Sequence, residues 1–149
     1  HQEGASLCGL GSRDVLRLEA ALLLHGTDMD TSVNPLEAGL GRFVKLEKEF
    51  VASKALADVK EAGLSRKLVG FQMVAKGIPR HGYEIVDVSG NLIGHVTSGA
   101  YSPTLDIPIG LGYVTVESFA PGTRVFIDIR GRSTEAEIVS LPFYSRRRP

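Results

Sequence analysis

Apolar residues recur at helical spacing in two segments near the start of the chain, residues 13–24 and 53–62. Ser12 is a suitable N-cap for the first segment, and Gly26 follows its last apolar residue. Gly63 stands where a glycine commonly ends a helix, directly after the second segment. The pattern therefore predicts two helices in this part of the chain.

After Gly63 the apolar residues alternate with polar ones, which is the period of a half-buried strand. Turn residues such as Ser89-Gly90-Asn91 and Pro121-Gly122 separate the alternating segments. The predicted strands are residues 67–74, 83–88, 92–98, 110–116, 124–129 and 133–141. Six short strands at this spacing indicate a closed antiparallel barrel or a small sandwich, and closure is favoured because it removes exposed edges.

The sequence thus predicts an α+β fold, with an N-terminal helical segment followed by a six-stranded antiparallel β-barrel. We place the boundary so that residues 1–62 form a helical remnant of a larger region and residues 63–149 form the barrel domain. The chain begins with His1 rather than Met, and we expect it to be part of a longer protein.

The first predicted helix combines an apolar face with an unusual density of charge. Its apolar face contains Val15, Leu16, Leu18, Leu22 and Leu23. Arg13 and Arg17 lie on the opposite side, and Asp14 is placed in the first turn, where it can pair with Arg17 at i+3. Glu19 interrupts the apolar face, and a buried carboxylate is costly without donors. We expect Glu19 to be a structural acid bonded to backbone amides.

The net charge of the chain argues against nucleic acids and anionic membranes as binding partners. Lys and Arg total 17, as do Asp and Glu, so the formal net charge is zero. Nucleic-acid and anionic-membrane binders need surplus cations, and neither partner is predicted here. No apolar run approaches the roughly 20 residues that span a bilayer. The single cysteine, Cys8, fits a reducing, cytoplasmic environment better than secretion.

Motifs for common catalytic chemistry are missing from the sequence. The four histidines lack metal-binding spacing, and the three Gly-Leu-Gly segments do not extend into phosphate-binding loops. No nucleophile motif occurs, so the sequence predicts neither a catalytic residue nor a metal site. The terminal run of arginines at residues 146–148 is either a solvated tail or a clamp for a carboxylate.

Several segments resemble the C-terminal part of the glycine cleavage system T-protein family. In chain order they are Gly9-Leu10-Gly11-Ser12-Arg13-Asp14, Leu16-Arg17-Leu18-Glu19-Ala20, Asn34-Pro35-Leu36-Glu37-Ala38, Arg66-Lys67-Leu68-Val69-Gly70, Gly94-His95-Val96-Thr97-Ser98-Gly99, Ser102-Pro103-Thr104-Leu105 and Pro142-Phe143-Tyr144. The resemblance covers nearly all of the chain from Gly9. It departs from the family at Ala21 and Ala52, where glycine is common, and at His25, where tyrosine is usual.

The resemblance implies an aminomethyltransferase that depends on tetrahydrofolate. Such enzymes take an aminomethyl group from the lipoyl arm of the H-protein, release ammonia and pass the one-carbon unit to tetrahydrofolate. The family's catalytic aspartate lies in its N-terminal part, and no residue here corresponds to it. We therefore expect this chain to be inactive unless the missing N-terminal part, or a partner subunit, is joined to it. The family works in the cytoplasm, or in the mitochondrial matrix of eukaryotes.

Arg13 is the site residue that the resemblance implies most clearly. It matches the arginine that lines the family's folate and substrate pocket, and a guanidinium fork suits a carboxylate or a pterin oxygen. The alternative is a salt bridge between Arg13 and a neighbouring carboxylate. The family also brings a residue near its C-terminus to the pocket, for which Tyr144 and the arginines up to Arg148 are the candidates.

A second hypothesis is a non-catalytic barrel module that binds folate or a carrier protein. The related iron–sulfur maturation proteins carry a cysteine motif between the helical part and the barrel, and residues 48–53 contain none. Demethylases and the folate domains of sarcosine-type oxidases share the barrel, and the sequence does not exclude membership of either group. If this chain forms half of a pocket, it should expose an apolar patch at Val15, Leu18 and Leu22.

Overall fold

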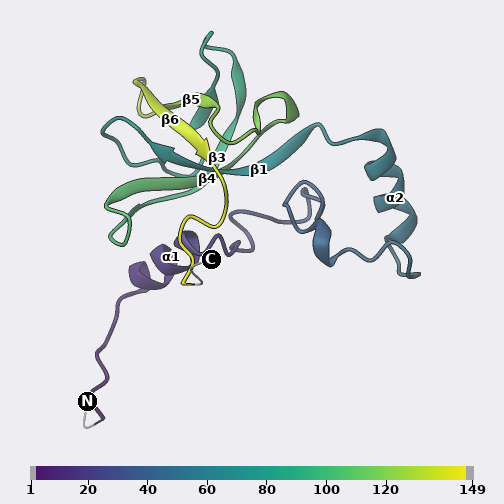
Figure 1. Cartoon of the computed structure of the whole chain (residues 1–149), viewed down its shortest axis with the longest axis horizontal. Helices are drawn as coiled ribbons and strands as arrows, with labels where there is room; N and C mark the ends of the chain where they lie inside the picture. The colour runs from purple at the N-terminus through teal and green to yellow at the C-terminus, as the bar shows by residue number, and fades with distance from the viewer. Residues whose placement is uncertain (1–2, 147–149) are drawn as a thin grey trace.

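The structure is a computed structural model that describes residues 3–146 (Figure 1). Two α-helices and one short 3₁₀ helix come before the strands. They are α1 (Leu10–Glu19), η1 (Gly41–Phe43) and α2 (Ser53–Ala62). The remaining elements are β1 (Arg66–Met73), β2 (Glu84–Val86), β3 (Leu92–Ser102), β4 (Ile107–Thr115), the 3₁₀ helix η2 (Val116–Ser118), β5 (Arg124–Asp128) and β6 (Ser133–Val139).

The six strands close into a barrel in the order β1-β4-β3-β2-β5-β6, and every pair is antiparallel. This confirms the predicted α+β fold with a six-stranded antiparallel barrel. The barrel interior is filled by aliphatic side chains around Phe71, which is fully buried. Each predicted strand overlaps an observed one. The largest difference is the β3–β4 hairpin, which extends four residues beyond the predicted end of its first strand.

A second apolar layer lies on the outside of the barrel, where α1 packs against β3 and β4 (Figure 1). Leu18 is completely buried there against Leu68, Ile109, Leu111 and Tyr113. Because β1 and β4 are covered on both faces, their central residues are buried without interruption. This double coverage explains why alternation is weak in these two strands.

The third Gly-Leu-Gly segment lies within β4 and serves packing. A methyl group at Gly112 would come within 2.6 Å of the His95 carbonyl oxygen, and one at Gly110 would overlap the ring of Phe71. These two glycines therefore allow close contact between strands and with a large core side chain.

Helix α1 differs from its prediction at both ends. It begins at Leu10 with Gly9 as N-cap, and the Ser12 hydroxyl donates to the Gly9 carbonyl at 2.6 Å rather than capping a free amide. Arg13 is consequently the fourth residue of the helix, and Asp14 lies beyond the first turn. The helix ends at Glu19, well before the predicted Leu24, because Ala21 turns the chain with φ +54°.

The exposed apolar face of α1 is also different from the predicted one. Leu18 is buried and Val15 is half-buried, so these residues pack on the barrel instead of facing solvent. Leu10, Leu16 and Leu22 are exposed by 78%, 61% and 62%. The prediction of an exposed apolar patch was correct for Leu22 and wrong for Val15 and Leu18, because the predicted apolar stripe was too broad and its inner half faces the barrel.

Helix α2 has the predicted bounds, and Gly63 ends it with φ +84°. Leu56 is its one buried residue among those described. No helix among residues 3–146 combines the length and apolar character that a membrane crossing requires.

Candidate functional site

A groove of about 490 Å³ lies between the first half of α1 and the barrel. Its walls include Arg13 and Arg17 from α1, Arg80 and His81 from the segment before β2, and Ser98 from β3. Three guanidinium groups thus come from sequence positions as far apart as 13 and 80. A groove of this volume and charge suits a ligand that carries an anionic group.

Arg17 holds α1 against the barrel. Its Nη1 lies 2.5 Å from the Asp28 carboxylate, and its Nη2 donates to Ser98 Oγ at 2.8 Å. Its Nε and Nη2 donate to Asp14 at 2.9 and 2.7 Å, so the predicted i+3 pair is confirmed. These bonds use both edges of the guanidinium. Arg17 is therefore a wall of the groove with little remaining capacity for a ligand.

Asp28 is the buried partner in this arrangement, with 1% of its surface exposed. Besides Arg17 it accepts hydrogen bonds from the Leu24 amide at 2.9 Å and from the Thr97 hydroxyl at 2.7 Å. A buried carboxylate is tolerated when donors on several sides satisfy it. The pair therefore joins three segments, namely α1, the turn after it and β3.

Arg13 lies one helical turn before Arg17, and its side chain is exposed at the groove. Among the described residues it has no ion pair or hydrogen-bond partner for its guanidinium. The salt bridge considered as an alternative role for Arg13 is therefore not formed within residues 3–146. The guanidinium fork is available to a ligand or to another part of the protein.

Glu19 has the structural role predicted for it, with one of the predicted backbone amides and two hydroxyl groups as its donors. It is 2% exposed and accepts from Ser102 Oγ at 2.5 Å and Thr104 Oγ1 at 2.9 Å, with the Thr104 amide farther away at 3.4 Å. Two hydroxyl groups thus fix the end of α1 to the β3–β4 turn.

Within the described residues, neither of the two candidates from the C-terminal tail is found beside Arg13. The Tyr144 amide donates to the Glu19 carbonyl at 2.9 Å, so the tail returns to the opposite end of α1, and the Tyr144 ring is exposed. Tyr144 does not line the groove with Arg13. Arg148 lies outside the described residues.

Arg17, Asp28 and Arg80 were missed as site residues from the sequence. Arg17 offered a signal, since an arginine one turn from Arg13 shares its side of a helix. Asp28 and Arg80 lie in polar, turn-rich segments without periodicity, and only the fold brings them together. No cluster of three or more His, Cys, Asp or Glu suited to a metal ion occurs within the described part of the chain.

Comparison with known proteins gives consistent matches along the chain. Residues 66–145 match the family model described as "Glycine cleavage T-protein C-terminal barrel domain", and residues 1–48 match the "GCVT N-terminal domain". The aminomethyltransferase of Symbiobacterium thermophilum is 50% identical over 145 residues, covering 96% of this chain and 38% of that protein. The aminomethyltransferase of Halothermothrix orenii is 53% identical over 136 residues, and the match covers 91% of this chain and 38% of that protein.

A crystal structure of the glycine cleavage system aminomethyltransferase T from Bartonella henselae is similar in fold. Its TM-score is 0.90 at 39% sequence identity, and the match covers 95% of this chain and 40% of that one. The chain thus spans about 40% of the length of the aminomethyltransferases that it matches.

Proposed function

This chain belongs to the glycine cleavage T-protein family, and from that membership we propose that it is the C-terminal part of an aminomethyltransferase that uses tetrahydrofolate. The reaction would take the aminomethyl group carried by the lipoylated H-protein, release ammonia and leave the one-carbon unit on tetrahydrofolate. In this proposal residues 1–62 complete the folate-binding region, and residues 63–149 form the barrel domain.

The observation that carries the proposal is the guanidinium of Arg13 at the α1 groove, which has no partner within residues 3–146. Arg17 is held by two carboxylates and Ser98, so the helix is fixed, while Arg13 has no such contact to the part of the chain that the structure describes. A permanently charged, planar donor set held on a fixed helix is suited to orient a carboxylate or a pterin oxygen. We assign Arg13 to binding and positioning of the folate at the groove. Tyr144 and Arg148 remain proposals from the tail, and Tyr144, which lies at the other end of α1, would contact a different part of the ligand from Arg13.

No residue of this chain is proposed as the catalytic acid. We propose that the group which moves protons is supplied by the N-terminal part of the enzyme or by a partner subunit. The chain's own residues would then bind and orient the folate at the groove and shield it from water. The isolated chain is accordingly expected to form no methylenetetrahydrofolate.

The first testable prediction uses a chimera. The C-terminal 38% of the Symbiobacterium enzyme that matches this chain would be replaced by it, and methylenetetrahydrofolate formation would be assayed with lipoylated H-protein and the other glycine cleavage components. We expect activity from the chimera, and an Arg13→Ala chimera should lose about 10- to 100-fold because a charge-assisted contact is removed. Arg13→Lys should recover only part of this loss.

The matched control is Arg124→Ala, since Arg124 is an exposed β5 residue paired with Glu135 at 2.9 Å and far from the groove in sequence. Its chimera should keep full activity. A folded chimera that binds tetrahydrofolate but transfers no one-carbon unit would favour the non-catalytic binding module instead. Equal rates for the Arg13→Ala and parent chimeras would remove Arg13 from the site.

A further inference from the structure

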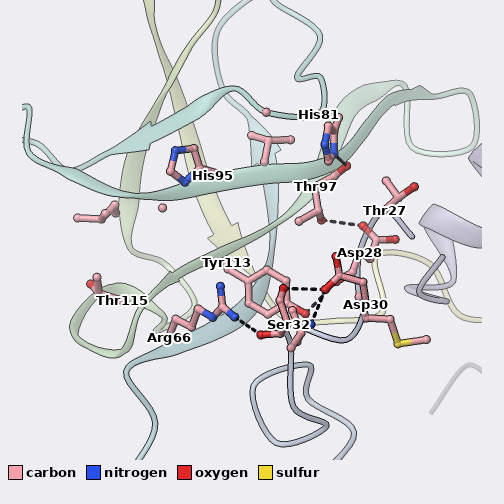
Figure 2. A pocket seen from close by; sticks show the side chains of 16 residues that line it. Thr27, Asp28, Asp30, Ser32, Arg66, His81, His95, Thr97, Tyr113 and Thr115 are labelled. Carbon is pink, nitrogen blue, oxygen red and sulfur yellow. Dashed lines mark hydrogen bonds between the residues drawn. The ribbon is translucent and has the colours of Figure 1, made fainter. Parts of the chain in front are cut away.

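A second cavity, of about 460 Å³, lies on the outer face of the barrel between β1, β3, β4 and the loop of residues 27–33 (Figure 2). It shares Thr27, His81 and Thr97 with the α1 groove, but Arg13 does not line it. Its volume lies in the range of small-molecule sites. The transfer reaction proposed above uses none of the groups that are particular to this cavity.

Arg66 is fixed at one wall of the cavity on three sides. Its Nη2 donates to the Ser32 carbonyl at 2.8 Å, its Nε donates to Glu37 at 3.2 Å, and its guanidinium lies 5.3 Å from the centre of the Tyr113 ring. Within residues 3–146 its Nη1 has no hydrogen-bond partner. Figure 2 shows this end of the guanidinium directed toward the space below His95. Arg66 is thus pre-organised, with one donor edge facing the cavity.

The charge of Arg66 is only partly neutralised by its neighbours. Glu37 also accepts from the Asn34 amide at 3.1 Å, and its two contacts to Arg66 are long, at 3.2 and 3.5 Å. Asp30 lines the cavity too, but Ser32 satisfies it through its amide at 2.8 Å and its hydroxyl at 2.6 Å. These bonds hold the pKa of Asp30 below its usual value. Asp30 therefore stays an anion beside the cavity without occupying Arg66.

Two imidazoles face the cavity from the other side (Figure 2). His81 Nδ1 lies 2.9 Å from the Thr97 carbonyl, and because a carbonyl only accepts, Nδ1 carries the hydrogen. Its Nε2 has no hydrogen-bond partner within residues 3–146 and can contact a ligand. His95 has no side-chain partner among the described residues. An imidazole N–H can donate to an anion whether the ring is neutral or protonated.

We propose that this cavity binds a small organic acid, whose carboxylate lies between Arg66 Nη1 and His95. The planar guanidinium edge matches a carboxylate. Val33 and Ile93 supply apolar wall for the rest of the molecule. The anionic Asp30 disfavours doubly charged ligands such as phosphate, since like charges at one site repel.

The experiment titrates the 149-residue chain with butyrate and follows the side-chain NMR signals of Arg66 and His95. Butyramide, which has the same shape without the charge, and inorganic phosphate are the comparison ligands. We expect saturable shifts with butyrate and binding of butyramide and phosphate at least about tenfold weaker. Because no transfer reaction is measured, the outcome is independent of the proposed transferase function.

Two variants decide whether Arg66 and His95 form the site. Arg66→Gln should weaken butyrate binding about tenfold or more, and His95→Phe, which keeps an aromatic ring without a donor, should also weaken it severalfold. Arg124→Gln is the matched control for the loss of one ion-paired arginine and should bind normally. If Arg66→Gln does not fold, His95→Phe decides alone. Butyrate binding equal to wild type in the folded variants, or equal affinity for butyramide, would overturn the proposal.

Discussion

The buried carboxylates Glu19 and Asp28 differ in how far the sequence identifies their role. Glu19 interrupts an apolar face, so burial with donors could be predicted from periodicity alone. Asp28 lies in a polar turn where any acidic residue would pass unnoticed. Its role depends on Arg17 and on Thr97, which is 69 positions away in the chain. The sequence predicts which residues a charged side chain can contact along its own helix, but it does not predict contacts with residues far away in the chain.

Tyr113 provides a prediction of how stability depends on pH. It is 8% exposed and its hydroxyl donates to the Asp28 carbonyl at 2.9 Å. Burial is the main cause that raises its pKa to about 12. The folded state favours the protonated phenol, so its contribution is complete below pH 10 and is lost as the pH rises toward 12. The free energy of unfolding should fall by about 2–3 kcal/mol across this range from Tyr113 alone.

Urea unfolding at pH 8 and pH 11.5 would check this prediction by comparing the wild type with Tyr113→Phe. The variant should be about 1 kcal/mol less stable at pH 8, because the Asp28 carbonyl loses a partner, and should depend less on pH. Other groups also titrate there, including Tyr101, whose pKa is raised by its bond to Asp106. These contributions cancel in the difference. Parallel pH profiles for the two proteins would contradict the role of Tyr113.

Among the elements, the six strands and both helices were predicted, but the bounds of α1 were wrong at both ends. Turn residues separate the strands, and Gly63 ends α2, so local chemistry defines these bounds. In α1 the apolar pattern continues past Glu19 to Leu24, but the chain turns at Ala21. A non-glycine residue with positive φ gives no local signal of a helix end. The helix instead ends where Glu19 makes its tertiary contacts with Ser102 and Thr104.

The turn after α1 predicts a stabilising substitution. The Ala21 amide bonds to the Leu18 carbonyl at 2.9 Å and the Leu22 amide to the Arg17 carbonyl at 2.8 Å, which is the Schellman arrangement that favours glycine. Ala21→Gly should therefore raise the free energy of unfolding by about 0.5–1 kcal/mol, since glycine adopts φ > 0 without steric cost.

Denaturant unfolding would measure this gain, with Ala20→Gly as the control. Ala20 has φ −81°, where alanine is not strained, so glycine there should be neutral or destabilising. A loss of stability in Ala21→Gly, of the size seen for Ala20→Gly, would contradict the account of strain at Ala21.

At the scale of the whole molecule, one side of α1 is covered by the barrel and the other side is exposed within the described residues. Leu18 packs on the barrel, while Leu10, Leu16 and Leu22 face solvent close to one another along the helix and its C-terminal turn. Since the chain spans about 40% of the matched aminomethyltransferases, we infer that their N-terminal part covers this surface. The sequence predicted that such a patch exists, but which leucines form it depends on the face of the helix that packs on the barrel.

This surface predicts self-association of the isolated 149-residue chain. Sedimentation velocity should show dimers or larger species, and Leu16→Glu should shift them toward monomer with no loss of thermal stability. Val88→Glu replaces an equally exposed apolar residue on the β2–β3 turn and should leave the association unchanged. A wild-type chain that stays monomeric up to about 100 μM would contradict the prediction, because apolar patches of this kind drive association at such concentrations.

The two hydroxyl groups that hold Glu19 are among the late contacts on which a stable α1 depends during protein synthesis. Thr104 lies 85 positions after Glu19, so the ribosome needs several seconds to supply it, at about 5–20 residues per second. A helix of ten residues is marginal by itself. Until the β3–β4 turn emerges, the nascent chain therefore carries an unformed α1 with its leucines exposed. This interval is the period in which the chain would depend most on chaperones.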